Sequence, residues 1–213
     1  MALKSKRSEA PTPRDRARAA RTDVYREHIL EAAEQVFAES GFEAAKLQDI
    51  SKRASLSMGT IYAIFPGKTE LLAAILDRRG REMLELARAV VARGGKPLAT
   101  LDELIAAYIS YFVDHPTFLQ MHLRQGTSWV LTPTDGGNDR AQIWSEIHAL
   151  QAELFRRGVK DGSFVKEDPE LLAKAFSALD QVVLADWVAT GMKATQAQLI
   201  QRLQNFAARA FRP

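Results

Sequence analysis

The side chains that could perform acid–base or metal chemistry are few and widely spaced in this 213-residue chain. Its four histidines are His28, His115, His122 and His148, and Pro116 interrupts the pair that lies closest in sequence. The chain has no cysteine, which removes disulfides, thiolate metal ligands and a cysteine nucleophile. It also lacks the P-loop, G-x-S-x-G and H-E-x-x-H patterns. We therefore expect no enzyme, no metal site and no cofactor.

One short segment points to a different chemistry. Residues 56–72 read LSMGTIYAIFPGKTELL, and no side chain from Ser57 to Phe65 is charged. Hydroxyl and apolar groups of this kind can contact base edges, including the methyl group of thymine. A Pro-Gly break then precedes Lys68 and a new apolar run. A lysine in the first turn of a helix favours an anion, because its charge adds to the free backbone N–H groups.

Basic charge is concentrated in the first 22 residues, which hold seven lysines and arginines against two acidic residues. With two prolines and few large apolar groups, this segment is expected to be a disordered basic arm. It is either a solubilising tail or an arm that contacts phosphates. The arm has no apolar signal core, and no apolar run in the chain is long enough to span a bilayer. We expect a cytoplasmic protein without a membrane partner.

Helical spacing dominates the chain after the arm, and no segment shows strand alternation between hairpin turns. Glycine and proline pairs mark the breaks between the periodic segments. The expected helices span residues 23–40, 47–54, 58–65, 68–92, 98–114, 116–125, 139–160, 168–190 and 195–211. The sequence predicts an all-α protein, in which a small three-helix unit is joined by a long helix to a larger bundle.

The first three expected helices have the order and lengths of a helix-turn-helix. Within the turn, Leu56 would fill the gap between the helices, and Ser57 could cap the next helix near Thr60. Met58, Thr60 and Tyr62 would then face outward. A short helix that presents its N-terminal residues outward suits entry into the major groove of DNA. On spacing alone, a helical hairpin without a nucleic-acid role remains open.

The segment from Val36 to Leu72 resembles the DNA-binding signature of TetR-type transcriptional repressors. The matching residues are Phe37, Gly41, Phe42, Ile50, Ala54, Ser57, Gly59, Thr60, Tyr62, Phe65, Pro66, Lys68, Leu71 and Leu72. The resemblance implies a helix-turn-helix DNA-binding domain over residues 23–70 and a ligand-binding and dimerisation domain over residues 71–213. It also implies a ligand-responsive regulator, usually a repressor, that binds a double-stranded DNA operator.

The resemblance assigns the DNA contacts to the turn and to the two helices around it. Helix 47–54 would support helix 58–65 in the major groove, Thr60 and Tyr62 would contact DNA, and Lys68 would hold a phosphate. The expected DNA-binding residues are Lys46, Gln48, Ser57, Met58, Gly59, Thr60, Tyr62 and Lys68.

Several positions depart from the pattern of the family. Met58 and Ala63 stand where many relatives carry basic or aromatic residues, and Ser55 stands where many have glycine. We expect a mildly strained backbone at Ser55. The electrostatic attraction to DNA would then come from Lys46, Lys52, Lys68 and the basic arm.

The last two expected helices carry apolar residues on two sides, which favours packing inside the protomer and against a partner. The resemblance implies a homodimer through the helices near 168–190 and 195–211. A purely intramolecular bundle and an all-α protein-interaction module without DNA binding are the alternatives.

The middle helices would enclose a small, largely apolar or aromatic effector. The candidate ligand-binding residues are Tyr108, Phe112, Phe118, Met121, His122, Trp129, Trp144, His148 and Trp187. Aromatic residues at helical spacing are also ordinary core. An effector that prefers a form with misplaced recognition helices would weaken DNA binding by the same coupling factor.

Overall fold

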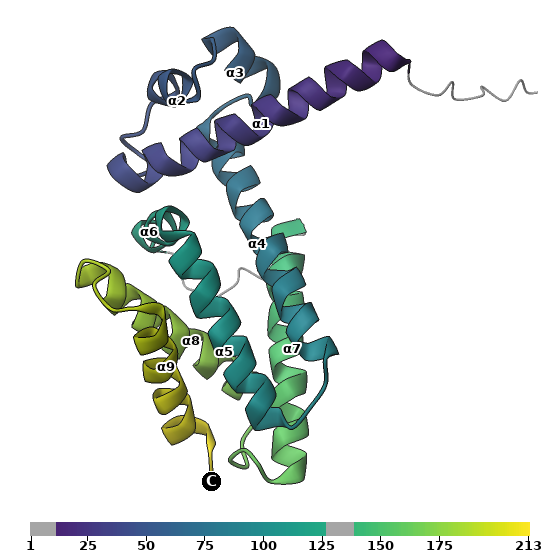
Figure 1. Ribbon diagram of the computed structural model, residues 1–213, viewed down its shortest axis with the longest axis vertical. Helices are drawn as coiled ribbons and strands as arrows, with labels where there is room; N and C mark the ends of the chain where they lie inside the picture. The colour runs from purple at the N-terminus through teal and green to yellow at the C-terminus, as the bar shows by residue number, and fades with distance from the viewer. Residues whose placement is uncertain (1–11, 127–138) are drawn as a thin grey trace, which may run out of the picture.

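The computed structural model describes residues 12–126 and 139–213, and in these two ranges the chain forms nine α-helices and no strand (Figure 1). The all-α prediction is therefore confirmed. The helices are α1 (Pro13–Ser40), α2 (Leu47–Ala54), α3 (Met58–Ile64), α4 (Lys68–Ala92), α5 (Pro97–Asp114), α6 (Pro116–Arg124), α7 (Asp139–Asp161), α8 (Pro169–Ala189) and α9 (Gln196–Phe211).

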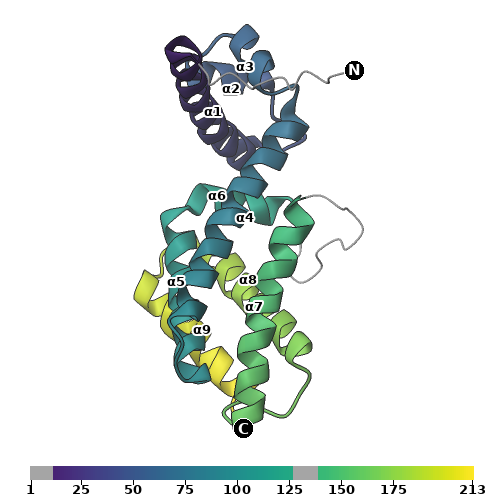
Figure 2. The same ribbon diagram turned by 90° about the vertical axis from the view of Figure 1, so that its right-hand side faces the viewer.

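The three N-terminal helices form a unit at one end of the molecule, and the larger bundle of α5–α9 forms the other end (Figures 1 and 2). Helix α4 runs from the first unit into the second, so it joins them physically (Figure 2). Inside the N-terminal unit, Phe37, Ile50 and Ile61 are fully buried, one from each helix. These apolar contacts fix the positions of α2 and α3 on α1.

Helix α1 begins at Pro13, and the prediction of disorder is therefore wrong for residues 13–22. Thr12 and Asp15 form a capping box, in which the Thr12 hydroxyl accepts from the Asp15 backbone N–H at 3.2 Å. Pro13 occupies the first helical position, where its fixed φ suits helix entry. Alanine and arginine, which dominate this stretch, have high helix propensity. Residues 1–11 of the predicted arm lie outside the described residues.

Helices α4 and α7 pack closely where Gly80 lies in the middle of α4. A methyl group added at Gly80 would approach Cγ2 of Ile143 to 3.2 Å. Glycine costs helix stability relative to alanine, and here it permits the close approach of α7.

The bundle core is made of aromatic rings from several helices. Phe155 of α7 contacts Phe176 of α8 and Phe211 of α9, with ring centroids 6.4 and 5.0 Å apart. The chain end is tied down as well, because Val165 N–H donates to Phe211 O at 2.8 Å. Among the helices in the described ranges, none is long and apolar enough to cross a membrane.

Candidate nucleic-acid interface

The turn between α2 and α3 has the left-handed residue that the sequence predicted. Ser55 has φ 54° and ψ 37°, a conformation that costs a residue with a Cβ more than it costs glycine. The hydroxyl of Ser51 donates to Leu56 O at 2.6 Å, a contact that the sequence did not indicate. This hydrogen bond ties the turn to α2 and so fixes the angle at which α3 leaves it.

Helix α3 is capped, and of the three residues predicted to face outward Tyr62 is exposed, whereas Met58 and Thr60 are half-buried. The Ser57 hydroxyl accepts from the Thr60 N–H at 3.1 Å and lies 2.9 Å from the Thr60 hydroxyl. Ile61 is fully buried, whereas Tyr62 is 53% exposed. Gly59 is exposed too. Helix α3 is thus a short helix that one apolar side chain anchors, and its outer face presents hydroxyl and aromatic groups.

The supporting helix α2 is held against α1 by a bidentate ion pair. Arg53 donates to both carboxylate oxygens of Glu39, at 2.6 and 2.7 Å. The hydrogen bond from Arg53 holds the pKa of Glu39 below its usual range. Lys46, Gln48 and Lys52 are all exposed near this helix, as a contribution to DNA affinity would require.

Lys68 has a structural contact that the sequence did not predict. Its Nζ donates to the carbonyls of Phe42 and Glu43, both at 2.8 Å, and lies 4.7 Å from the centroid of the Phe42 ring. The side chain therefore fixes the start of α4 to the loop between α1 and α2. Two of its three ammonium N–H groups are used inside the protein, which leaves one for a phosphate.

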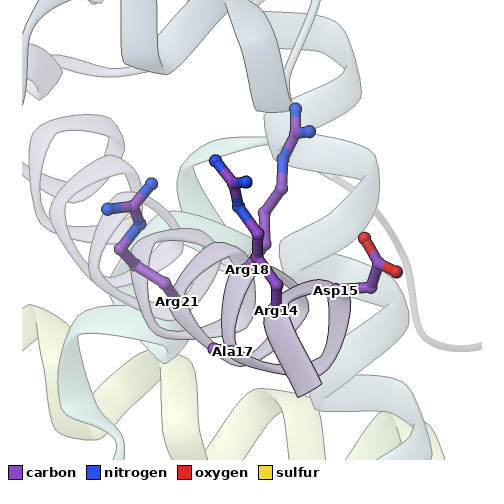
Figure 3. Close-up of a pocket in the computed structure, with 5 residues that line it drawn as sticks. All are labelled: Arg14, Asp15, Ala17, Arg18 and Arg21. Atoms are coloured by element: carbon purple, nitrogen blue, oxygen red, sulfur yellow. The ribbon is translucent and has the colours of Figure 1, made fainter. Parts of the chain in front are cut away.

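The first turns of α1 carry a row of arginines. Arg14, Arg18 and Arg21 line an open surface pocket together with Asp15 and Ala17. Figure 3 shows that the three guanidinium groups leave the helix on the same side. Because the spacing of four and three residues repeats the helical turn, helix formation aligns charges that a disordered arm would disperse.

A charged cluster joins the N-terminal unit to the bundle, and we call it the junction cluster: Glu34, Arg79, Glu82 and Tyr111. Glu34 of α1 is only 5% exposed and accepts two hydrogen bonds of 3.0 Å from Arg79 of α4. Arg79 also donates to Glu82 at 3.0 Å, and the Tyr111 hydroxyl donates to Glu82 at 2.6 Å. Burial alone would raise the pKa of Glu82, but the hydrogen bonds from Tyr111 and Arg79 outweigh it and lower that pKa.

Helix α6 makes a second connection between the two parts of the molecule. Arg124 donates to the backbone carbonyl of Glu39 at the end of α1, at 3.0 Å. A movement of α6 would therefore displace α1, against which α2 and α3 pack.

The predicted ligand-binding residues lie mostly in the bundle core. Phe112 and Phe118 stack with centroids 6.2 Å apart, and His122 lies 6.4 Å from Trp144. Burial lowers the pKa of His122 to about 4, so the ring is neutral at pH 7. Met121 is also buried, and His148 is half-buried.

Trp187 and Trp129 are the two remaining tryptophans among the predicted ligand-binding residues. Trp187 is buried and donates from Nε1 to Ala194 O at 3.0 Å, so it closes the connection between α8 and α9. Trp129 lies outside the described residues.

The sequence did not single out a group of polar residues that is buried beside Tyr108. We call it the core polar cluster: Tyr108 of α5, Gln151 of α7, and Ser177 and Asp180 of α8. Asp180 is 3% exposed and occurs in an otherwise apolar stripe with Phe176. An acidic residue at core spacing in a helix is the signal that could have found it. Within the described part of the chain, no group of histidine, aspartate and glutamate could hold a metal ion.

Known bacterial regulatory proteins are similar in sequence to this chain. The model of the family described as "Bacterial regulatory proteins, tetR family" matches residues 29–75. The HTH-type transcriptional repressor KstR2 of Rhodococcus jostii is 26% identical over 170 residues, which are 80% of this chain and 82% of that protein. The transcriptional regulator YuxN of Bacillus subtilis is 25% identical over 99 residues, which are 46% of this chain and 34% of that protein.

A solved structure has the same overall arrangement. The crystal structure of the MbdR regulator from Azoarcus sp. CIB superposes with a TM-score of 0.71 at 23% sequence identity. The superposition covers 86% of this chain and 96% of that chain. The shared arrangement therefore extends well beyond the helix-turn-helix, into the bundle.

Proposed function

We propose that this chain, a TetR-type DNA-binding transcriptional regulator by its similarity to that family, represses transcription. It would do so by placing α3 in the major groove of a palindromic operator. The observation that carries the proposal is the exposed face of α3 at the far end of the molecule from the bundle. Tyr62 is exposed on this face with the half-buried Thr60 beside it, and Ile61 is buried on the opposite side. A recognition helix needs this division.

The charge for the complex would come from groups around α3 rather than from α3 itself. Lys46 precedes α2 and Lys52 lies in its last turn, and the arginine row on α1 adds a further positive surface. Phosphate contacts of this kind supply affinity and register, whereas contacts to base edges supply specificity. Lys68 has one N–H left for a phosphate, so its main contribution in this proposal is to hold the start of α4 in place.

A homodimer would present two copies of α3 to successive turns of the DNA. Helices α8 and α9 expose large apolar side chains that the protomer does not cover: Leu171 is 52% exposed, Val182 is 62% exposed and Phe206 is 41% exposed. Apolar surface of this size on adjacent helices favours association. The two-fold axis of such a dimer would match the two-fold axis of a palindromic operator.

The bundle would bind a small effector that shifts the protein away from the form that binds DNA. Two observations support a route for the shift: α4 carries the junction cluster, and Arg124 connects α6 to the end of α1. An effector that separates helices of the bundle would move α1 through these contacts. Because operator DNA lies in the cytoplasm of a bacterium, we propose that the protein acts there.

A mobility shift with DNA from the region upstream of the protein's own gene tests this proposal. We expect a retarded complex that excess non-specific DNA does not remove, and a protected sequence with two half-sites about 10 base pairs or a multiple of that apart. Sedimentation of the free protein should give a dimer. An all-α interaction module would bind no fragment specifically, and that result would contradict the proposal.

A further inference from the structure

The core polar cluster holds hydrogen-bonding capacity that the protein itself does not use. Gln151 Nε2 donates to the Tyr108 hydroxyl at a long 3.5 Å, and the Ser177 hydroxyl donates to Gln151 Oε1 at 3.2 Å. Among the described residues, no donor reaches Oδ1 of Asp180, although that atom is buried. Hydrogen bonds link Tyr108, Gln151 and Ser177, and Asp180 lies one helical turn after Ser177 and acts electrostatically on Tyr108.

The burial of the Asp180 carboxyl group lowers the stability of the folded protein. Burial raises the pKa of its carboxyl group to about 7, and no cation in the described part of the chain offsets that effect. A buried carboxyl oxygen without a donor loses the hydration that it has in the unfolded chain. A leucine at this position would continue the apolar stripe of α8 without that cost. Unsatisfied buried groups of this kind are concentrated at functional sites.

We propose that the core polar cluster receives the head group of the effector, and that this head is a protonated amine on an apolar body. The inference rests on the proposed function of the bundle and adds the chemical class of the ligand. An ammonium group brings both the donors and the charge that Asp180 lacks. The amide oxygen of Gln151 and the hydroxyl groups of Tyr108 and Ser177 can accept its other hydrogens.

The surroundings of the cluster determine the rest of the ligand. The ring of Tyr108 stacks on Phe176 with centroids 6.3 Å apart, and the ring of Phe155 lies 6.4 Å from that of Phe176. These rings favour an aromatic or aliphatic body behind the amine. A carboxylate head would meet the carboxyl group of Asp180 and is disfavoured by like charge.

The same geometry links binding to movement. Because the cluster is closed between α5, α7 and α8, a ligand can reach Asp180 only if these helices separate. A ligand that binds the opened form shifts the population toward it. Helix α5 also carries Tyr111 of the junction cluster, so the separation would reach α4 and α1.

Thermal unfolding of the full-length protein with three probes of similar size tests the inference. The probes are 2-phenylethylamine, 2-phenylethanol and 3-phenylpropanoate at equal concentrations. We expect the amine to raise the Tm most and to bind about tenfold more tightly than the alcohol, which equals 1.4 kcal/mol. Equal effects of the amine and the alcohol, or a larger effect of the carboxylate, would overturn the inference.

Two variants show whether the effect comes from Asp180. Asp180→Asn keeps the shape and removes the charge, and it should abolish the advantage of the amine. Asp186→Asn removes an exposed carboxylate from the same helix and should keep that advantage. If Asp180→Asn responds like the wild type, the head group does not bind at this place.

Operator binding by the ligand-free protein distinguishes a failure of this inference from a failure of the proposed function. A protein that binds DNA but shows no preference for the amine retains its proposed function and loses this inference. A protein that prefers the amine through Asp180 but binds no DNA retains the site and loses the proposed function.

Discussion

Two serines two residues apart have opposite effects in the turn that positions α3. Ser55 adopts the left-handed region at φ 54°, and Ser57 caps α3. The departure from glycine at position 55 was visible in the sequence, because a tight turn between helices commonly needs a positive φ. The capping role of Ser57 was predicted and is confirmed by its hydrogen bond to Thr60.

We predict that Ser55→Gly raises the free energy of unfolding by about 1 kcal/mol, because glycine adopts the left-handed region without the clash of a Cβ. Ser57→Ala should lower it by about 1 kcal/mol through loss of the cap. Urea unfolding followed by circular dichroism measures both. Equal signs for the two variants would show that the turn is not strained as described.

A second prediction concerns Asp180, whose pKa is about 7 in the folded chain and near 3.8 when unfolded. The folded carboxyl group holds its proton more tightly, so its contribution is fully present below pH 3.8 and is lost as the pH rises to about 7. Asp180→Asn does not titrate. Relative to the wild type, the variant should gain stability over this interval, by about 4 kcal/mol in total.

Urea unfolding of both proteins between pH 4 and pH 8 measures the gain. Asp186→Asn, on the exposed side of the same helix, serves as the control and should show a much smaller trend. A constant difference between Asp180→Asn and the wild type at all pH values would mean that Asp180 is not buried in its acid form.

At the level of helices, local signals predicted most boundaries well. The Gly94-Gly95 pair and the His115-Pro116 pair end α4 and α5 at the expected places, because glycine and proline act on the backbone within one or two residues. The basic composition of residues 13–22 predicts disorder, whereas the capping box at Thr12 begins a helix there. Composition describes an average, whereas a cap is a specific hydrogen bond.

The contacts between helices could not be predicted from the sequence. Lys68 meets the carbonyls of Phe42 and Glu43, more than 20 positions away, and no spacing rule connects them. The core polar cluster is similar, since its members become neighbours only when α5, α7 and α8 pack. The exposed face of α3 was predictable, because an amphipathic helix divides its residues by a period that can be read directly.

The junction cluster gives a prediction at the level of helices. Arg79→Ala leaves the carboxylate of Glu34 buried without its main partner, which should cost about 3–5 kcal/mol of stability. Arg88→Ala removes an exposed arginine of the same helix that pairs with Glu85 and with Glu146 of α7, and it should cost less than about 1 kcal/mol because both pairs are exposed to solvent. Thermal or urea unfolding compares them. Similar losses for both variants would contradict a buried junction.

At the level of the whole molecule, positive charge is separated from α3, the helix that we propose contacts the bases of DNA. The arginine row on α1 and the lysines beside α2 flank an uncharged α3. DNA binding by such a surface should depend steeply on salt, because each phosphate contact releases counterions. This division explains how a helix without charge can serve in a nucleic-acid interface.

We predict that the triple variant Arg14→Ala, Arg18→Ala, Arg21→Ala weakens binding to all DNA sequences and flattens the salt dependence. The log–log slope should fall by about 0.9 for each phosphate that the variant no longer neutralises. The matched control removes three exposed lysines of the bundle, through Lys160→Ala, Lys166→Ala and Lys193→Ala. Binding titrations at several salt concentrations give the slopes. An unchanged slope in the arginine variant would assign the row to solubility alone.

The most direct test of the central claim is a fluorescence anisotropy titration of operator DNA with the Thr60→Ala, Tyr62→Ala double variant. Each side chain should contribute about 1–3 kcal/mol, so we predict a loss of at least about 30-fold in specific affinity, with thermal stability unchanged. Gln142→Ala, an exposed change on α7, should bind as the wild type does. Full operator affinity in the double variant would contradict the claim that α3 reads the DNA.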